Sequence, residues 1–362
     1  MSVTIKDIAM LAGVSHQAVS AALNGNGSSR VSAVNKEKIC RIARELNYVP
    51  NAIARKFVGG NTKAIGIVSA VYPGWNMHLM GEICLLLTSK GYHTLINHFS
   101  GGTSFSPQST LLELVSRGID GVIILNSNSR KELRKGLTVP CVFGSHNHLD
   151  GYDVAVNNET TGYIGTRHLL AHGHDRVMYL SVMHHPGNER LQGWERAHAE
   201  RNIAVTPEDA VALRDIGGSF SNLMEIIRAR RFRAVFCSND YIAAKLMKAL
   251  LTHGVRVPED IAIMGCDGHS FIEFGPVSLS TVIQPIRPQA EAIVDLMLKR
   301  IETRETGSRP ADINVEPLLH LGGSCGCRPE TEMEELYRIN TLGALEKDMM
   351  LNFNKNILED IS

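Results

Sequence analysis

Apolar residues recur at every third or fourth position in three short runs near the start of the chain. The first run, residues 5–12, begins after Thr4 and stops at Gly13, which can adopt the positive φ that ends a helix. The second run begins after Ser15 and the third after Ser32, and serine is a favourable N-cap. We therefore predict three short helices with a tight turn between the first two, as in a helix-turn-helix domain.

From residue 62 onward, continuous apolar runs alternate with helix-like segments. Such runs predict strands buried on both faces, and repeated strand–helix units predict parallel sheets flanked by helices. Two sets of strands follow each other, so we expect an α/β core of two lobes, each a doubly wound parallel sheet, behind an all-α first domain. The expected strands are "AIGIVSAV", "YHTLINHF", "GVIIL", "VPCVFGS", "DVAVNN", "DRVMYLS", "AVFCSND", "DIAIMGCDG" and "LSTVIQP", and the expected helices are 80–90, 111–116, one ending at 172, 189–201 and 241–251.

The last part of the chain has a different pattern. After Arg328-Pro329, apolar residues recur at three and four positions from Leu336 to Phe353, which predicts an amphipathic helix within an extension over residues 326–362. This helix either docks on its own core or self-associates into a higher oligomer. We favour docking, because fewer than four heptads are available.

Charge is distributed unevenly along the chain. Lys+Arg and Asp+Glu both total 37, yet residues 1–60 contain eight basic and three acidic residues. A basic first domain on a mildly acidic body is typical of proteins that bind a polyanion such as DNA.

Several features favour a cytoplasmic protein. The start of the chain lacks the charged and apolar segments of a secretory signal, and no run reaches the roughly 18 apolar residues of a membrane span. The seven cysteines are mostly scattered singly in apolar runs, as is typical of reduced core thiols.

The second predicted helix has a small, polar exposed face. In a helix-turn-helix domain this face enters the major groove of DNA. Gln17 can form a paired hydrogen bond to adenine, His16 can contact base edges or phosphate, and Ala21 can touch only a thymine methyl group. The alternative is an ordinary helical hairpin with a solvated face. The candidate residues are Ser15, His16, Gln17, Ser20, Ala21 and Asn24.

The segments "IKDIAMLAGVSHQAVSAALNG" and "VSAVNKEKICRIARELNYVPNAIARKFVGGNTKAIGIV" resemble the lactose-repressor/galactose-repressor (LacI/GalR) family, and the resemblance extends to about residue 325. It implies a DNA-binding domain over residues 1–48, a hinge helix and linker over 49–61, and a periplasmic-binding-protein-like core over 62–325. It further implies a ligand site between the two lobes at the carboxyl ends of the strands.

The resemblance also implies how the hinge works. In the family this segment folds when it is paired with its dimer mate on DNA, and an apolar side chain wedges into the minor groove. The matching residue is Phe57, where leucine is usual; the alternative is that Phe57 belongs to the core of the next domain. Ala21 is a second departure, because relatives often carry arginine there. Further DNA contacts implied by the resemblance are Thr4, Arg30, Asn51 and Ala54.

Candidate ligand contacts lie in or after the predicted strands. "NERLQGWERAH" matches the family's Arg-x-x-Gly-aromatic motif, so Arg190 is the expected fork donor to ligand hydroxyls or a carboxylate. Aromatic residues beside polar donors suit a sugar or sugar derivative. For each polar residue the alternative is a helix cap, the role we assign to Asp240. The other candidates are Tyr72, Trp75, Ser145, Phe220, Asn239, Asp267 and Gln284.

Metal and catalytic signals are weak. The pairs His146/His148, His172/His174 and His184/His185 lack a matching cysteine or carboxylate spacing and are interpreted as surface loops. Cys325-Gly326-Cys327 alone is weak evidence for metal or redox chemistry. No phosphate loop or nucleophile motif is present, so we expect no enzyme activity, no metal and no cofactor.

The sequence therefore favours a ligand-responsive repressor that binds a pseudo-palindromic DNA operator as a homodimer. It does not indicate whether ligand strengthens or weakens DNA binding. Coupling requires only that the ligand binds two states of the protein with unequal affinity. A sugar-binding protein of transport or chemosensing is the main alternative, and an enzyme on a doubly wound fold is a more distant one.

Overall fold

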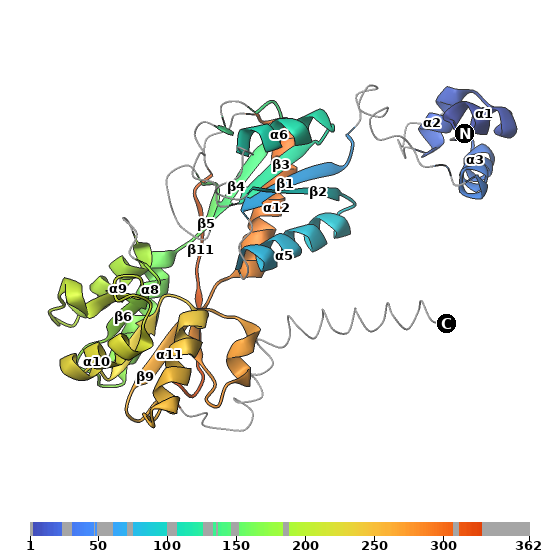
Figure 1. Ribbon diagram of the computed structural model, residues 1–362. Helices are drawn as coiled ribbons and strands as arrows, with labels where there is room; N and C mark the ends of the chain where they lie inside the picture. Colours follow the sequence, from blue (N-terminus) through green and yellow to red (C-terminus); the bar gives the residue numbers. More distant parts are fainter. Residues whose placement is uncertain are drawn as a thin grey trace. The chain divides into compact units, whose positions relative to one another are not determined.

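The computed structural model describes residues 3–23, 31–46, 48, 61–70, 75–99, 107–125, 133–134, 137–145, 152–183, 188–306 and 311–327. The chain divides into two units, Met1–Ala64 and Ile65–Ser362. Figure 1 shows the elements of each unit. The predicted hinge helix and the predicted C-terminal helix lie outside the described residues.

The first unit contains the three helices that the sequence predicts: α1 (Ile5–Ala12), α2 (His16–Leu23) and α3 (Ala33–Glu45). The backbone N–H of Thr4 donates to Asp7 Oδ2 at 2.8 Å, which fixes the start of α1. Gly13 ends α1 with φ of 70°, and Ser15 Oγ accepts from the N–H of Ala18 at 3.1 Å at the start of α2. Local capping chemistry therefore sets the turn between α1 and α2.

A small apolar core holds these helices together. Its buried residues come from all three helices, and Lys38 adds a polar tie between α3 and α1 by donating from Nζ to the carbonyl of Ala12 at 3.0 Å. A cation at the carboxyl end of a helix is favourable because the helix dipole is negative there. The buried residues are Ile8, Ala9, Ala12, Val19, Ala22, Ile39 and Ala43.

The first sheet of the second unit has six strands in the order β11-β5-β4-β3-β1-β2. Helices α5 and α12 pack on one of its faces, where they lie side by side (Figure 1). The strands are β1 (Ala64–Ala70), β2 (His93–Phe99), β3 (Gly121–Leu125), β4 (Cys141–Ser145), β5 (Val154–Val156) and β11 (Ile313–Val315), and the helices are α5 (Trp75–Ser89), α6 (Pro107–Ser116) and α12 (Ile286–Thr303).

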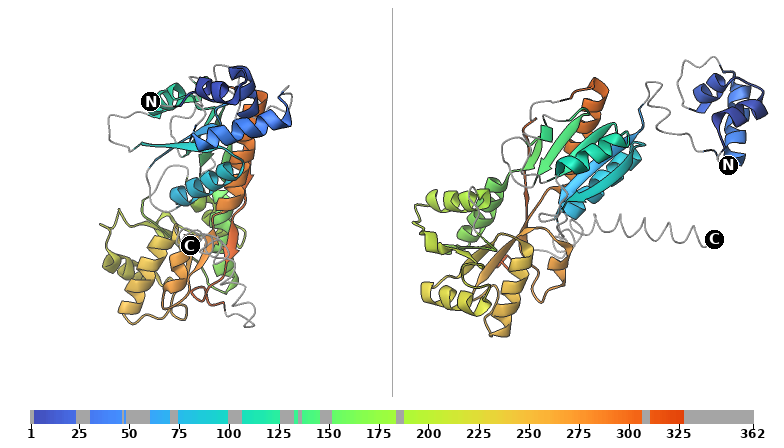
Figure 2. Two further views of the ribbon diagram at one scale, coloured as in Figure 1. Left: turned by 90° about the vertical axis from the view of Figure 1, so that its right-hand side faces the viewer. Right: turned by 45° about the horizontal axis from the view of Figure 1, so that its top comes forward.

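The second sheet also has six strands, in the order β12-β10-β9-β8-β6-β7. Helices α8 and α9 pack on one face and α10 and α11 on the other, each over its own apolar cluster (Figure 2). The strands are β6 (Met178–Ser181), β7 (Ala210–Ala212), β8 (Ala234–Cys237), β9 (Ala262–Asp267), β10 (Ser280–Ile283) and β12 (Leu318–His320). The helices are α8 (Asn158–Ala171), α9 (Glu189–Ala199), α10 (Phe220–Arg230) and α11 (Asp240–Thr252), with 3-10 turns η1 (Pro207–Asp209) and η2 (Ser270–Phe274).

Strand pairing confirms the predicted parallel sheets. In the first sheet β1 pairs with β3, β3 with β4, β4 with β5 and β5 with β11, all parallel. In the second sheet β6, β7, β8, β9 and β10 pair in parallel, and β12 pairs antiparallel with β10.

The sequence pattern suggested that the two lobes are consecutive segments of the chain, but they are not. After β10 in the second sheet the chain returns to the first, where α12 covers the sheet and β11 extends its edge, before β12 returns to the second. Two of the segments that connect the lobes are hydrogen-bonded to each other. The N–H of Asn157 in one donates to the carbonyl of Val315 in the other at 3.1 Å. The apolar face of α12 packs on the first sheet. The spacing of apolar residues indicates which face of a helix is buried but not which sheet buries it.

None of the helices in the described ranges combines the length and the apolar character that crossing a membrane requires.

Candidate functional site

Helix α2 presents the polar face that the sequence predicts. Ser15, His16 and Gln17 are exposed, whereas Val19 and Ala22 on the opposite side are buried in the core of the first unit. Ser20 and Ala21 are partly exposed. The start of α2 therefore lies on the surface of the first unit.

Two of the predicted DNA contacts also have structural roles. The hydroxyl of Thr4 donates to Asp7 Oδ2 at 2.7 Å, and the hydroxyl of Ser15 caps α2. The predicted contacts Asn24, Arg30, Asn51, Ala54 and Phe57, and the predicted ligand contact Tyr72, lie outside the described residues and stay predictions.

Arg190 is the centre of a polar cluster in the second lobe. Its Nε donates to Asn158 Oδ1 at 2.7 Å, its Nη1 donates to the carbonyl of Ser238, and its Nη2 lies 3.4 Å from Asp267 Oδ1. These four residues, which we call the Arg190 cluster, join the starts of α8 and α9 to the carboxyl ends of β8 and β9. Polar groups at the carboxyl ends of parallel strands are typical of ligand sites in such sheets.

Glycines bring α9 close enough to α8 for Arg190 to reach its partners. A Cβ atom at Gly193 would overlap the carbonyl oxygen of Glu159, and one at Gly162 would overlap that of Arg190. Trp194, the aromatic residue of the same motif, is buried and donates from Nε1 to the carbonyl of Val177 at 2.8 Å. In the Arg-x-x-Gly-aromatic motif, Arg190 thus makes the polar contacts of the cluster, and Gly193 and Trp194 pack the helices.

A buried carboxyl group, that of Asp240, and a partly buried one, that of Asp267, shape the loop after β9. Asp240 accepts from the N–H groups of Gly268 and His269 at 2.7 and 2.8 Å and from Thr281 Oγ1 at 2.6 Å. The prediction that Asp240 caps a helix is wrong, because Asn239 caps α11 and the Asp240 side chain holds the loop after β9 instead. Asp267 has a φ of 119°, unusual for a residue with a side chain. Burial raises the pKa of both carboxyls, and for Asp267 the neighbouring Arg190 charge opposes this rise.

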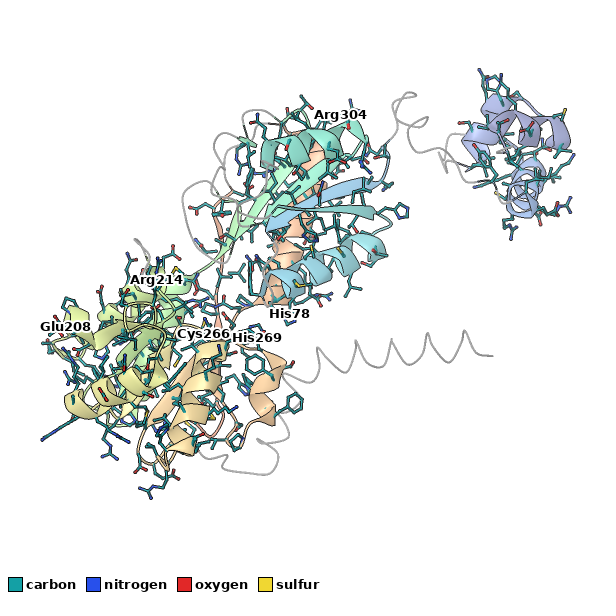
Figure 3. The ribbon with its side chains drawn as sticks, in the orientation of Figure 1. His78, Glu208, Arg214, Cys266, His269 and Arg304 are labelled. Carbon is teal, nitrogen blue, oxygen red and sulfur yellow. The ribbon has the colours of Figure 1, made fainter. Side chains whose placement is uncertain are left out.

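His269 connects the Arg190 cluster to the first lobe. Its Nε2 lies 3.8 Å from Asp267 Oδ2, and its ring centroid lies 5.8 Å from that of His78 on α5. Figure 3 shows His78 and His269 facing each other where the two lobes meet. Burial lowers the pKa of His269. Sequence reasoning missed both histidines, although His269 directly follows the "GCDG" strand end.

Gln284 lies next to the cluster, whereas Asn239 acts as a helix cap. The backbone N–H of Gln284 donates to the carbonyl of Asp267 at 3.2 Å, and its buried Oε1 has no hydrogen-bond partner among the described residues. Asn239 Oδ1 accepts from the N–H of Ile242 at 2.9 Å at the start of α11. Ser145 ends β4 in the first sheet, and its carbonyl accepts from Gln289 Nε2 at 2.6 Å.

The two described aromatic candidates belong to hydrophobic cores. Trp75 was predicted to contact ligand, but it is the first residue of α5 and is only 9% exposed, packed in the apolar cluster of the first lobe. Phe220 is the first residue of α10 and packs against the α10–α11 side of the second lobe. Burial of large apolar side chains is favourable, which explains why both rings pack in the cores.

The histidine and cysteine signals combine in a way that sequence reasoning missed. His172 ends α8 and lies beside His168, Cys325 and Cys327, rather than in a histidine-only loop with His174. The spacing of four residues between His168 and His172 was the available signal. Of the other predicted pairs, His146, His148, His184 and His185 lie outside the described residues.

Comparisons with known proteins agree with this architecture. Residues 4–51 match the bacterial regulatory proteins of the lacI family, and residues 166–325 match the periplasmic binding protein-like domain. The HTH-type transcriptional repressor PurR of Vibrio vulnificus (strain CMCP6) is 30% identical over 331 residues, which cover 86% of this chain and 96% of the relative. The ribose operon repressor of Haemophilus influenzae is 31% identical over 308 residues, covering 83% and 92%.

Among solved structures, the lac repressor dimer bound to operator and the anti-inducer ONPF has a TM-score of 0.75 at 22% sequence identity. The match covers 90% of this chain and 99% of that chain, so the fold is shared over nearly the whole length.

Proposed function

Because the chain belongs to the LacI family of bacterial regulatory proteins, we propose that it is a repressor that binds a pseudo-palindromic operator as a homodimer. A small polar effector, a sugar or sugar derivative, binds between the two lobes and changes the affinity for DNA. The observation that carries this proposal is the exposed polar start of α2 on a basic first domain.

Base recognition is assigned to the start of α2. Gln17 is exposed there, and its amide can pair with both hydrogen-bonding atoms of adenine in the major groove. His16 and Ser20 reach neighbouring base edges or phosphates. Basic residues elsewhere in the domain supply the sequence-independent attraction to phosphate, which weakens as salt is raised.

A salt titration with a matched pair of variants tests this assignment. Wild-type protein, selected on genomic fragments, should prefer one palindrome and lose affinity steeply with salt. Gln17→Ala should lower the preference for that palindrome about 5- to 150-fold, equal to about 1–3 kcal/mol, without changing the salt slope. Val34→Ala, an exposed change on α3, is the control. Failure of the wild-type protein to prefer any duplex would contradict the proposal.

Effector binding is assigned to the Arg190 cluster and Gln284. The Arg190–Asp267 contact of 3.4 Å is long for a hydrogen bond, so ligand hydroxyls can replace it at little cost. Gln284 Oε1 is a buried acceptor that a ligand hydroxyl would satisfy. Alternating donors and acceptors of this kind suit a polyhydroxylated ligand.

A thermal-shift screen against sugars, polyols, sugar acids and nucleobases tests the effector class. The ligand that raises Tm in the wild-type protein should fail to do so in Arg190→Lys, which keeps the charge but loses the planar fork. Arg196→Lys, an exposed arginine of the same helix, should keep the full response. An unchanged shift in Arg190→Lys would place the ligand elsewhere.

Dimer formation is assigned to the second unit. Met77 and Leu85 on α5, Tyr241 on α11 and Phe274 are large apolar side chains that are exposed, and Phe274 is 82% exposed. A dimer interface over these side chains would remove them from water, which is favourable. Leu85→Glu together with Phe274→Glu should convert the dimer to a monomer in light-scattering measurements. A monomeric wild-type protein would contradict this part of the proposal.

A further inference from the structure

Four side chains with metal-binding atoms meet at the carboxyl end of α8. His168 and His172 come from the last turn of the helix, and Cys325 and Cys327 come from the segment after β12. Each offers one donor atom, and these atoms all lie within 4.8 Å of one another. We propose that these four residues bind one Zn²⁺ ion in a closed, structural site.

The distances fit a tetrahedral ion. His168 Nε2 lies 3.2 Å from His172 Nε2, 3.3 Å from Cys325 Sγ and 3.5 Å from Cys327 Sγ. His172 Nε2 lies 3.2 Å from Cys327 Sγ. Bond lengths of about 2.0–2.1 Å to nitrogen and about 2.3 Å to sulfur give tetrahedron edges of about 3.3–3.8 Å. Four of the six donor pairs are therefore near the spacing of a Cys₂His₂ centre, and the other two lie within 4.8 Å, so a small shift of one side chain completes the tetrahedron.

Hydrogen bonds alone do not account for this geometry. A neutral imidazole nitrogen carries either one proton or one lone pair, so it makes one good hydrogen bond. His168 Nε2 nevertheless has three neighbours within 3.5 Å. A cation at the centre would satisfy all four donors at once, and two thiolates would balance its charge.

The cluster is held in place by contacts outside it. The helix puts residues four apart on one face, which aligns His168 with His172. On the other side, Ser324 Oγ donates to the carbonyl of Ile263 at 2.7 Å and accepts from the N–H of Ser280 at 2.8 Å. Gly326 has a φ of 93°, so the chain turns between the two cysteines. Sheet and helix together thus orient the donors.

The donor set indicates the metal and its role. Mixed nitrogen and sulfur ligands in a tetrahedron suit Zn²⁺ better than Mg²⁺ or Ca²⁺, which prefer oxygen. Four protein ligands leave no open position, as in structural zinc sites. The site lies about 15–21 Å along α8 from Asn158, by the helix rise, so it is distinct from the Arg190 cluster. The ion would fasten residues 325–327 to α8.

Metal analysis of the full-length protein tests the site. Protein purified without a histidine tag, in a non-chelating reductant, should contain one zinc ion per chain. Removing zinc with a chelator should lower Tm, and added Zn²⁺ should restore it. Co²⁺ in place of zinc should give the visible bands of a tetrahedral ion and a thiolate charge-transfer band.

Surface variants distinguish this site from adventitious binding. His172→Gln and Cys327→Ser should lose the one-to-one stoichiometry, the thiolate band and the zinc-dependent rise in Tm, because each removes one donor at the accessible edge of the cluster. His174→Gln and Cys84→Ser are the controls and should keep all three. Absence of bound metal in wild type, a cobalt spectrum without thiolate bands, equal binding in the variants, or a Cys325–Cys327 disulfide in reduced preparations would each overturn the proposal. Operator binding is measured separately, so its failure is independent of this result.

Discussion

Helix α8 carries a polar cluster at each end, and the two clusters differ in how their atoms are bonded. At the amino end, Asn158 accepts from Nε of Arg190, and the two terminal nitrogens of Arg190 each have one acceptor, in Ser238 and Asp267. At the carboxyl end, Nε2 of His168 lies close to three other atoms that can bind a metal. The first end is satisfied by exchangeable hydrogen bonds and suits a polar ligand, whereas the second suits a cation.

The largest effect is expected where α8 and α9 touch. Gly193→Val would drive a side chain into the backbone at Glu159 and Tyr163 and force the helices apart. We expect a loss of about 3 kcal/mol or more in the free energy of unfolding, measured in urea. Gly81→Ala, on an exposed position of α5 with no atom within 4 Å, should be neutral or stabilising by up to about 1 kcal/mol. Equal stability of the two variants would show that this close approach is unnecessary.

A smaller effect is expected at the amino end of α8. Arg190→Ala would leave the partly buried Asp267 carboxylate without its cation and should cost about 2 kcal/mol at neutral pH. Without Arg190 the pKa of Asp267 rises further, so this loss should shrink at pH 5 and grow at pH 8. Urea unfolding at both values measures it. Arg196→Ala removes exposed ion pairs and a cation–π contact with Tyr163, and it should cost about 1 kcal/mol at either pH.

The smallest effect on stability is expected when pH is lowered, through His198 near the carboxyl end of α9. His198 accepts the N–H of Val177 at 3.0 Å through Nε2, so it is neutral when folded, and burial lowers its pKa. Stability from a lowered histidine pKa is complete above about pH 6.5 and is lost as pH falls below it. Asp240 and Asp267 have raised pKa values, so their contribution to stability grows as pH falls and opposes that of His198. The change in Tm between pH 7 and pH 5.5 should therefore be more favourable in His198→Gln than in the wild-type protein. An unchanged pH slope in that variant would exclude His198 as a cause.

The structure brings together three of the predicted ligand contacts, Arg190, Asp267 and Gln284. That they bind a ligand stays a prediction. Trp75 and Phe220 were chosen because aromatic rings stack on sugars, yet rings also fill cores, and both pack there. His78 and His269 were missed because their pairing depends on how the two lobes meet.

The sequence by itself determined the three helices of the first unit and most strands of the sheets, because caps, glycines and apolar runs act on neighbouring residues. Only the tertiary structure decided that α12 and β11 belong to the first sheet and that His168 meets Cys325, which is 157 residues away. Such contacts form when whole faces of helices and sheets are buried together, so no local pattern encodes them.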